Sequence, residues 1–200
     1  MTSITSRFQH RTWTKEGYLI STDPSSIPVE AANEMLGSDN VYWAKSMPDG
    51  IMLETLQNSL CFGLYSQNSS KDSQFPSNHT SAPGQFIGLA RCVTDYTTFL
   101  YLTDVYILPG HQGSGLGKWL VGCVQEVIDE MPYLRRSMLF TSDWKRSVPF
   151  YEGILGMEVM GKERGEGVAV MQRMGPGFPG FVKKGDEVGL TKEPAAGFTS

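Results

Sequence analysis

The chain has 200 residues, which is the length of one domain, since typical domains contain about 100 to 200 residues. It carries 17 Lys and Arg against 21 Asp and Glu, a formal net charge of −4. This acidic balance disfavours a general nucleic-acid binder, whose affinity depends on pairing cations with phosphates. The apolar runs are far shorter than the roughly 20 residues that cross a bilayer, so we expect no membrane-spanning helix and no membrane partner.

The N-terminus and the cysteines indicate a cytoplasmic protein. The first 13 residues are polar and contain Arg7, His10 and Arg11 without an apolar stretch behind them, unlike a secretory signal. The three cysteines are an odd number, widely spaced and embedded in apolar sequence, which favours buried reduced thiols over disulfides or zinc ligands. They are Cys61, Cys92 and Cys123.

The first half of the chain predicts alternating strands and helices within a single domain that occupies residues 1–200. Residues 1–15 read as an N-terminal extension. A strand is expected over 18–21, a helix over 27–36 that ends at Gly37, a second helix over 48–58 and a strand over 60–65. Residues 66–84 are rich in Ser, Asn, Gln and Pro and predict a polar loop inside a hairpin.

The second half begins with an antiparallel pair of strands and continues with the clearest helix of the chain. The strands are expected over 85–94 and 98–108, and apolar residues at steps of three and four then predict a helix from Ser114 that ends before Pro132. A strand over 137–142, a helix over 147–155, a hairpin of 157–162 with 168–174 and a loosely attached tail over 175–200 complete the predicted elements.

A glycine-rich stretch joins the second strand of this pair to the long helix. It reads Gln112-Gly113-Ser114-Gly115-Leu116-Gly117-Lys118. Glycines let backbone amides approach an anion closely, and a helix start supplies unpaired N–H groups and a partial positive charge. The stretch therefore predicts a phosphate site, with a tight turn used only for packing as the alternative.

Two common phosphate motifs do not fit its spacing. A P-loop requires Gly, four residues and then Gly-Lys-Ser/Thr, whereas Gln112 stands at the first position here and Trp119 at the last. The dinucleotide-binding motif requires G-x-G-x-x-G near the start of a parallel unit, whereas these glycines alternate after an antiparallel hairpin. Nucleoside triphosphatases and dinucleotide-binding enzymes are therefore disfavoured.

The six residues 112–117 match Gln/Arg-x-x-Gly-x-Gly/Ala, motif A of the GNAT superfamily of acyl-CoA-dependent N-acyltransferases. The Leu-Pro that ends the preceding strand, the amphipathic helix, Phe150-Tyr151-Glu152 and Leu155-Gly156-Met157 fall where that family has them. The chain thus resembles this superfamily from about residue 18 to 174. The resemblance implies an α/β (α+β) fold with a central mixed, mostly antiparallel sheet of six or seven strands, about four helices, and splayed fourth and fifth strands.

The same resemblance implies acetyl-CoA as the cosubstrate and no metal. The backbone amides of 112–118 would hold the CoA pyrophosphate, and the pantetheine arm would enter the gap between the strands over 98–108 and 137–142. The amide of Val105 or Ile107 would then stabilise the oxyanion, an effect commonly worth about 3 to 4 kcal/mol. The implied cofactor-binding residues are Val105, Tyr106, Ile107, Gln112, Gly113, Ser114, Gly115, Leu116, Gly117 and Lys118.

Acyl transfer also requires a neutral amine, and a lysine-like ammonium with a pKa near 10.4 is under about 0.1% neutral at pH 7. Asp104 is the candidate catalytic residue for accepting that proton directly or through water. Alternatively, it anchors neighbouring loops or positions a cationic acceptor. By resemblance, Tyr151 is the catalytic acid that protonates the departing CoA thiolate, with aromatic packing as its alternative.

Tyr42 and Trp43 are the candidate substrate-binding residues, because in this family the preceding segment walls the acceptor site and an aromatic pair can bind a cationic or apolar amine. Core packing is their alternative. The expected function is acetyl transfer from acetyl-CoA to a primary amine of a small molecule or peptide, by direct attack in a ternary complex, in a monomer or homodimer. A non-catalytic acyl-CoA-binding sensor or interaction module, and an O-acyltransferase or thioesterase on the same fold, remain open.

Overall fold

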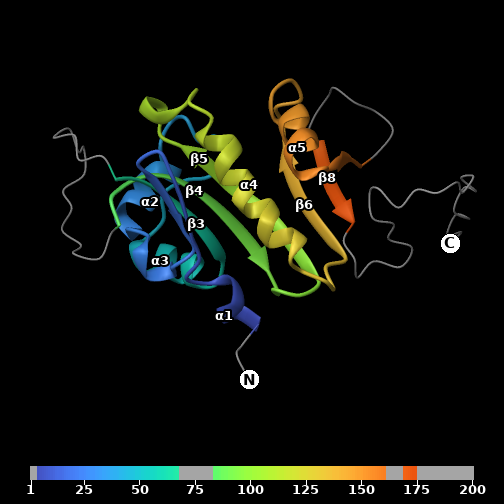
Figure 1. The fold of residues 1–200 in the computed structure, drawn as a ribbon. Helices are drawn as coiled ribbons and strands as arrows, with labels where there is room; N and C mark the ends of the chain where they lie inside the picture. The colour runs from blue at the N-terminus through green and yellow to red at the C-terminus, as the bar shows by residue number, and fades with distance from the viewer. Residues whose placement is uncertain (1–3, 68–82, 161–168, 175–200) are drawn as a thin grey trace, which may run out of the picture.

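The structure is a computed structural model that describes residues 4–67, 83–160 and 169–174 (Figure 1). In chain order it contains α1 (Ile4–Phe8), β1 (Thr12–Lys15), β2 (Tyr18–Ser21), the 3-10 turn η1 (Pro24–Ser26), α2 (Val29–Leu36), α3 (Asp49–Gln57), β3 (Leu60–Ser66) and β4 (Gln85–Thr94). It continues with β5 (Phe99–Ile107), the 3-10 turn η2 (Pro109–His111), α4 (Leu116–Asp129), β6 (Arg136–Thr141), α5 (Ser147–Leu155), β7 (Glu158–Val159) and β8 (Ala169–Met174). Most of the expected loop over 66–84 and the expected tail over 175–200 lie outside the described residues.

One sheet with the order β1-β2-β3-β4-β5-β6-β8-β7 runs through the molecule. Every neighbouring pair is antiparallel except β5 with β6, which confirms the mixed, mostly antiparallel sheet. The described residues form eight strands and five α-helices, whereas the sequence predicted six or seven strands and about four helices. The additional elements are α1 and β1, which have only five and four residues and lie in the segment that the sequence analysis assigns to an N-terminal extension.

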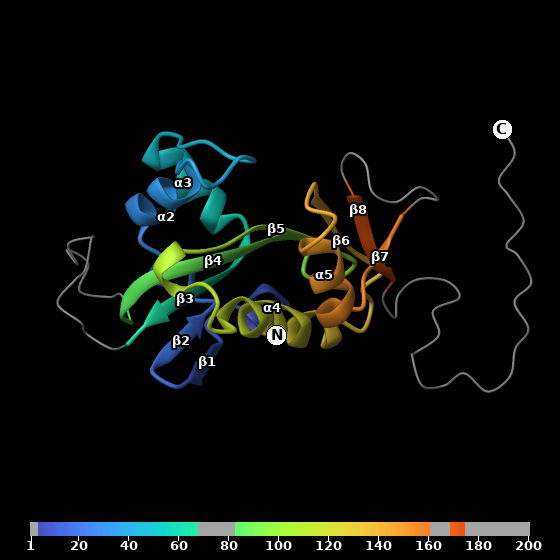
Figure 2. The ribbon, with the colours of Figure 1, turned by 90° about the horizontal axis from the view of Figure 1, so that it is seen from above.

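Helices cover both faces of the sheet. Figure 2 shows α2 and α3 on one side and α4 and α5 on the other. The larger core cluster lies under α4 and α5, and the second cluster lies under α2 and α3. The predicted periodicity of α4 is confirmed, because seven apolar side chains of its inner face are buried: Leu116, Leu120, Val121, Cys123, Val124, Val127 and Ile128. Burying one such side chain stabilises the fold by about 1.5 to 3 kcal/mol for the larger aliphatic residues.

Strand β5 contains a bulge at Asp104. The register pairs Leu89 with Tyr106 and Arg91 with Thr103, so β5 has one more residue than β4 between these pairs. Asp104 has φ +49°, in the left-handed region, where a side chain other than glycine carries strain. The bulge therefore shifts the register of β5 against β4 between the first and second halves of the strand.

Strands β5 and β6 separate soon after they meet. Their parallel register joins only Phe99–Tyr101 to residues 136–138. Beyond Tyr101, the side of β5 that faces β6 has no strand partner among the described residues. The expected separation of these two strands is thus confirmed, and the bulge lies just beyond the last pair.

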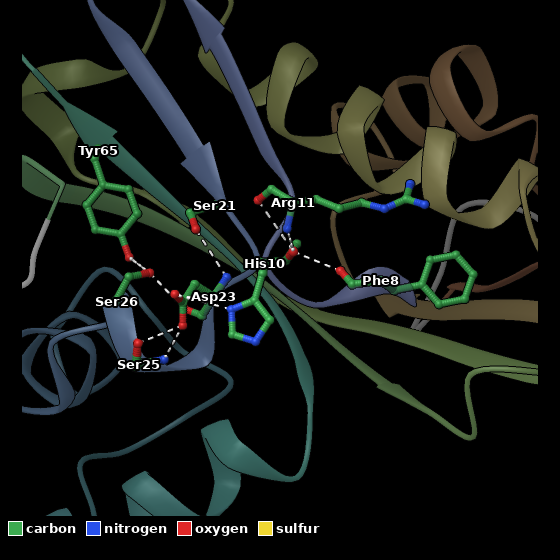
Figure 3. A network of polar contacts seen from close by, with 9 residues as sticks. Phe8, His10, Arg11, Ser21, Asp23, Ser25, Ser26 and Tyr65 are labelled. Atoms are coloured by element: carbon green, nitrogen blue, oxygen red, sulfur yellow. Dashed lines mark hydrogen bonds and ion pairs between the residues drawn. The ribbon is translucent and has the colours of Figure 1, made fainter. Parts of the chain in front are cut away.

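A polar network fixes the connection between β2 and α2 (Figure 3). The Asp23 carboxylate caps η1 and lies 3.3 Å from Nδ1 of His10. The Ser26 hydroxyl donates to the Asp23 carbonyl at 2.7 Å and lies 3.0 Å from the Tyr65 hydroxyl. The Thr22 hydroxyl donates to the last carbonyl of α1 at 2.8 Å. These contacts hold the N-terminal segment against β3 and the start of α2.

Candidate active site

The glycine-rich stretch forms a turn at the start of α4, directly after η2. Gly113 and Gly115 both have φ +82°, and a Cβ at either position would meet no atom within 4 Å. Their conformation, rather than crowding, is what favours glycine here. The cap residue of α4 is Gly115, so no side chain caps this helix, and the first-turn amides of Leu116, Gly117 and Lys118 have no intrahelical partner.

The two polar side chains of the turn bind backbone carbonyls instead of capping the helix. Gln112 donates from Nε2 to the carbonyl of Ile107, the last residue of β5, at 2.7 Å. Ser114 donates from its hydroxyl to the carbonyl of His111 at 3.1 Å. Gln112 therefore ties the turn to β5, and the amides at the start of α4 are left for another acceptor. Such first-turn amides are the donors that an anion at a helix start would use.

The end of β5 places its side chains on both faces of the sheet. Val105 packs against the core cluster under α4, and Ile107 belongs to that cluster. Tyr106 belongs to the cluster on the opposite face and lies 6.5 Å, between ring centroids, from Trp43. Its hydroxyl is buried without a hydrogen-bond partner within the described part of the chain. The side chain of Tyr106 thus lies on the face of the sheet that α2 and α3 cover.

Asp104 is buried at the bulge and accepts hydrogen bonds on both carboxylate oxygens. Arg91 donates from Nε to Oδ2 at 2.7 Å, and Trp43 donates from Nε1 to Oδ1 at 3.3 Å. Arg91 also donates from Nη1 to the Ser59 hydroxyl at 3.1 Å. Sequence reasoning missed Arg91, because only the register of β4 against β5 brings it to Asp104.

Tyr151 lies in the middle of α5 and is half-buried. Burial, with a smaller contribution from the Tyr42 hydroxyl, raises the pKa of Tyr151 to about 12. The Tyr151 ring packs edge-on against Phe150, with 5.1 Å between ring centroids. The phenol is therefore protonated at neutral pH, as a proton donor must be.

Tyr42 and Trp43 lie between α2 and α3 and are exposed by 70% and 43%, which rules out core packing. Their rings meet edge to face, 5.0 Å between centroids. The Tyr42 hydroxyl forms a hydrogen bond with the hydroxyl of Ser142, just beyond β6. The structure thus brings Tyr42 near Tyr151, and Trp43 against Asp104 and Tyr106.

The three cysteines lie buried in the fold, as thiols and not as disulfides, as the sequence predicted. Across residues 4–67, 83–160 and 169–174, no group of three or more His, Cys, Asp or Glu side chains is arranged to hold a metal ion. Every helix in those same ranges is too short or too polar to span a lipid bilayer.

Comparison with known proteins identifies the family. Residues 54–157, slightly more than half of the chain, match the model of the Acetyltransferase (GNAT) family. The chain is 40% identical over 173 residues to "Putative acetyltransferase FG08082" of Gibberella zeae, covering 82% of this chain and 93% of that protein. The chain belongs to the GNAT acetyltransferase family.

Solved structures agree with this assignment. A GNAT-family protein of Xanthomonas campestris is 30% identical, with a TM-score of 0.53 over 69% of this chain and 84% of that one. The spermidine N-acetyltransferase of Vibrio cholerae, solved with CoA and spermine, is 15% identical and shares the fold, with a TM-score of 0.55 over 80% of this chain and 96% of that one. This GNAT protein is therefore an acyltransferase, and its family uses acetyl-CoA.

Proposed function

We propose that this GNAT protein transfers the acetyl group of acetyl-CoA to a primary amine of a small molecule or peptide, by direct attack in a ternary complex. The observation that carries the proposal is the glycine turn: two residues with φ +82° lead into an α4 without a side-chain cap, at the end of a strand that has separated from its neighbour. The three buried thiols favour a reducing compartment, so we place the reaction in the cytoplasm, in a monomer or homodimer.

CoA would bind along the backbone from β5 to α4. The amides of residues 112–118 would hold the pyrophosphate, because they include the unpaired first turn of a helix. The pantetheine arm would lie beside Val105, Tyr106 and Ile107, where β5 has no strand partner on the β6 side among the described residues. Lys118 is exposed on the first turn of α4, where it would add positive charge near the phosphates.

The transfer step needs a base, an oxyanion donor and an acid. The acceptor ammonium would first lose a proton to Asp104, directly or through water. The neutral nitrogen would attack the thioester carbonyl, whose oxyanion the amide of Val105 or Ile107 would stabilise. The C–S bond would then break, the CoA thiolate would take the phenol proton of Tyr151, and the nitrogen would give its second proton through water to the resulting phenolate, which leaves a neutral amide, CoA thiol and a restored phenol.

An acetyl-transfer assay tests the proposal. The protein is incubated with acetyl-CoA and a panel of primary amines, while free thiol is followed by absorbance and acetylated amine by mass spectrometry. Equal amounts of thiol and acetyl-amine are expected. Thiol without acetyl-amine would instead identify a thioesterase, and CoA binding in calorimetry without thiol release would identify a binding module.

A further inference from the structure

The consecutive residues Tyr42 and Trp43 form hydrogen bonds with residues of both separating strands: Asp104 in β5 and Ser142 just beyond β6. Trp43 donates to Asp104, which lies three residues beyond Tyr101, the last residue of β5 that pairs with β6. Its neighbour Tyr42 forms a hydrogen bond with Ser142, which lies four residues beyond Met138, the last residue of β6 that pairs with β5. Since an extended strand rises about 3.3 Å per residue, the two contacts lie at most roughly 10 and 13 Å beyond the last paired residues. Tyr42 and Trp43 therefore cross the gap between β5 and β6.

The Trp43 contact is anchored deep in the molecule. Asp104 and Arg91 form an ion pair whose side chains are only 9% and 18% exposed. Arg91 continues to the Ser59 hydroxyl, which donates at 2.8 Å to the carbonyl of Thr55 on α3. A chain of hydrogen bonds thus leads from α3 through β4 and the bulge of β5 to the indole of Trp43.

The Tyr42 contact is of the opposite kind. Tyr42 is 70% exposed, and its hydrogen bond to Ser142 joins two exposed hydroxyls. Water competes for both groups, so this contact opens more easily than the part-buried hydrogen bond between Trp43 and Asp104. The hydroxyl of Tyr42 also lies close enough to Tyr151 to affect its ionisation. The segment is therefore fixed at Trp43, releasable at Tyr42 and adjacent to the acid assigned above.

We propose that Tyr42 and Trp43 form a bridge over the acyl-transfer site that keeps water away from the thioester, with Trp43 anchored on Asp104, Arg91 as the positioning residue for that anchor, and Ser142 as the releasable contact of Tyr42. This inference rests on the proposed function, because that function places the thioester between β5 and β6. The reaction that the bridge suppresses is hydrolysis: water attacks the thioester carbonyl, the C–S bond breaks, and acetate and CoA thiol are formed. An acceptor amine enters when the Tyr42 contact opens.

Hydrolysis without an acceptor tests the bridge. The protein is given acetyl-CoA alone, thiol release is timed, and the affinity for CoA is measured by calorimetry. Tyr42→Phe and Ser142→Ala each remove the same hydrogen bond, so each is expected to raise thiol release about 3- to 10-fold, and the double variant no further. Tyr133→Phe is the matched control, because Tyr133 is 68% exposed and lies in the turn between α4 and β6; it is expected to hydrolyse at the wild-type rate.

The position of Trp43 is tested separately by fluorine NMR on protein labelled with 5-fluorotryptophan, which gives four signals for its four tryptophans. Trp43→Phe identifies the signal of Trp43. Arg91→Met is expected to shift and broaden that signal alone, and Arg91→Lys to restore it in part. A general structural role for Arg91 would move several signals together.

The outcomes separate this inference from the proposed function. Wild-type protein that does not bind CoA would overturn the proposed function. Normal CoA binding with unchanged hydrolysis in Tyr42→Phe and Ser142→Ala would overturn the bridge alone. An unchanged Trp43 signal in Arg91→Met would remove Arg91 as a positioning residue.

Discussion

The two sides of the site are built in different ways. The proposed CoA side is continuous in sequence, made by the backbone of residues 112–118, with two glycines at φ +82°. The proposed acceptor side is made by side chains from separate segments, joined by the Trp43–Asp104, Arg91–Asp104 and Tyr42–Ser142 contacts. A backbone site depends on local conformation, whereas a side-chain site depends on register and packing. One substitution at a glycine should therefore abolish binding at the backbone site. Single substitutions at the side-chain site should each reduce its function only in part.

The largest effect is expected from Gly115→Glu. The new side chain would sit at φ +82° and place a negative charge where the pyrophosphate is proposed to bind, so CoA affinity should fall at least about 100-fold in calorimetry. Gly50→Glu is the matched control, since Gly50 also has open space around it but an ordinary φ and lies on α3. Unchanged CoA affinity in Gly115→Glu would contradict a pyrophosphate site at this turn.

Tyr151→Phe should slow turnover by about 100-fold or more while CoA affinity changes less than about twofold, because a positioned acid commonly contributes that much to rate. Steady-state kinetics and calorimetry measure the two effects. Tyr133→Phe serves again as the exposed control. Equal turnover in Tyr151→Phe would leave this tyrosine as a packing residue.

The pH profile sharpens the same assignment. Burial raises the pKa of Tyr151 to about 12, so the phenol keeps its proton throughout the range below that value. An acid with this pKa produces no alkaline fall in turnover between pH 7 and 10. Turnover that falls in this range in the wild type, but stays level in Tyr151→Phe, would contradict the assignment.

Asp104→Asn should lower both turnover and stability. The substitution leaves the half-buried Arg91 guanidinium without its charged partner, which should cost about 2 kcal/mol of unfolding free energy in urea titration. Turnover should fall about 10- to 100-fold if Asp104 accepts the acceptor proton. Asp129→Asn is the matched control, because Asp129 pairs with Arg173 at 2.8 Å but is 47% exposed, and its loss should cost under about 1 kcal/mol. Equal turnover would leave Asp104 as a positioning residue.

The smallest effect is expected from Arg11→Ala, far from both sides of the site. Arg11 donates to both Glu130 oxygens, at 2.8 and 2.6 Å, and this hydrogen bonding lowers the pKa of Glu130 below its ordinary value of 4.5. The pair therefore stabilises the fold above pH 4.5, and its contribution disappears as the pH falls through the lowered pKa. The exposed pair should contribute under about 1 kcal/mol at pH 7, with CoA affinity unchanged. A loss that persists at pH 2 would contradict an ionic origin.

Features that depend on neighbouring residues were predicted from the sequence more accurately than contacts between distant segments. The periodic apolar residues of α4 and the glycine turn were predicted closely, since both depend on residues a few positions apart. The helix expected over 27–36 begins only at Val29, because Pro24–Ser26 forms a separate 3-10 turn. The helix expected to reach almost to Pro132 ends at Asp129. The hairpin of 157–162 with 168–174 is confirmed only where β7 meets β8.

Contacts between distant residues were not predictable. Arg91 contacts Asp104 only because a bulge shifts the register of β4 against β5. The spacing of residues in the sequence does not predict the position of that bulge. Tyr42 meets Ser142 only because the segment between α2 and α3 extends to the end of β6. Each of these contacts depends on how whole elements are aligned.

The sequence by itself determined the long helix and the glycine turn, because periodic burial and left-handed glycines are local properties of the chain. The motif in that turn was also enough to indicate the acyltransferase family. The tertiary structure decided the contacts of the proposed acceptor side: the left-handed backbone at Asp104, the pairing of Asp104 with Arg91, and the exposed positions of Tyr42 and Trp43. These depend on strand register and on helix packing, which only the folded chain sets.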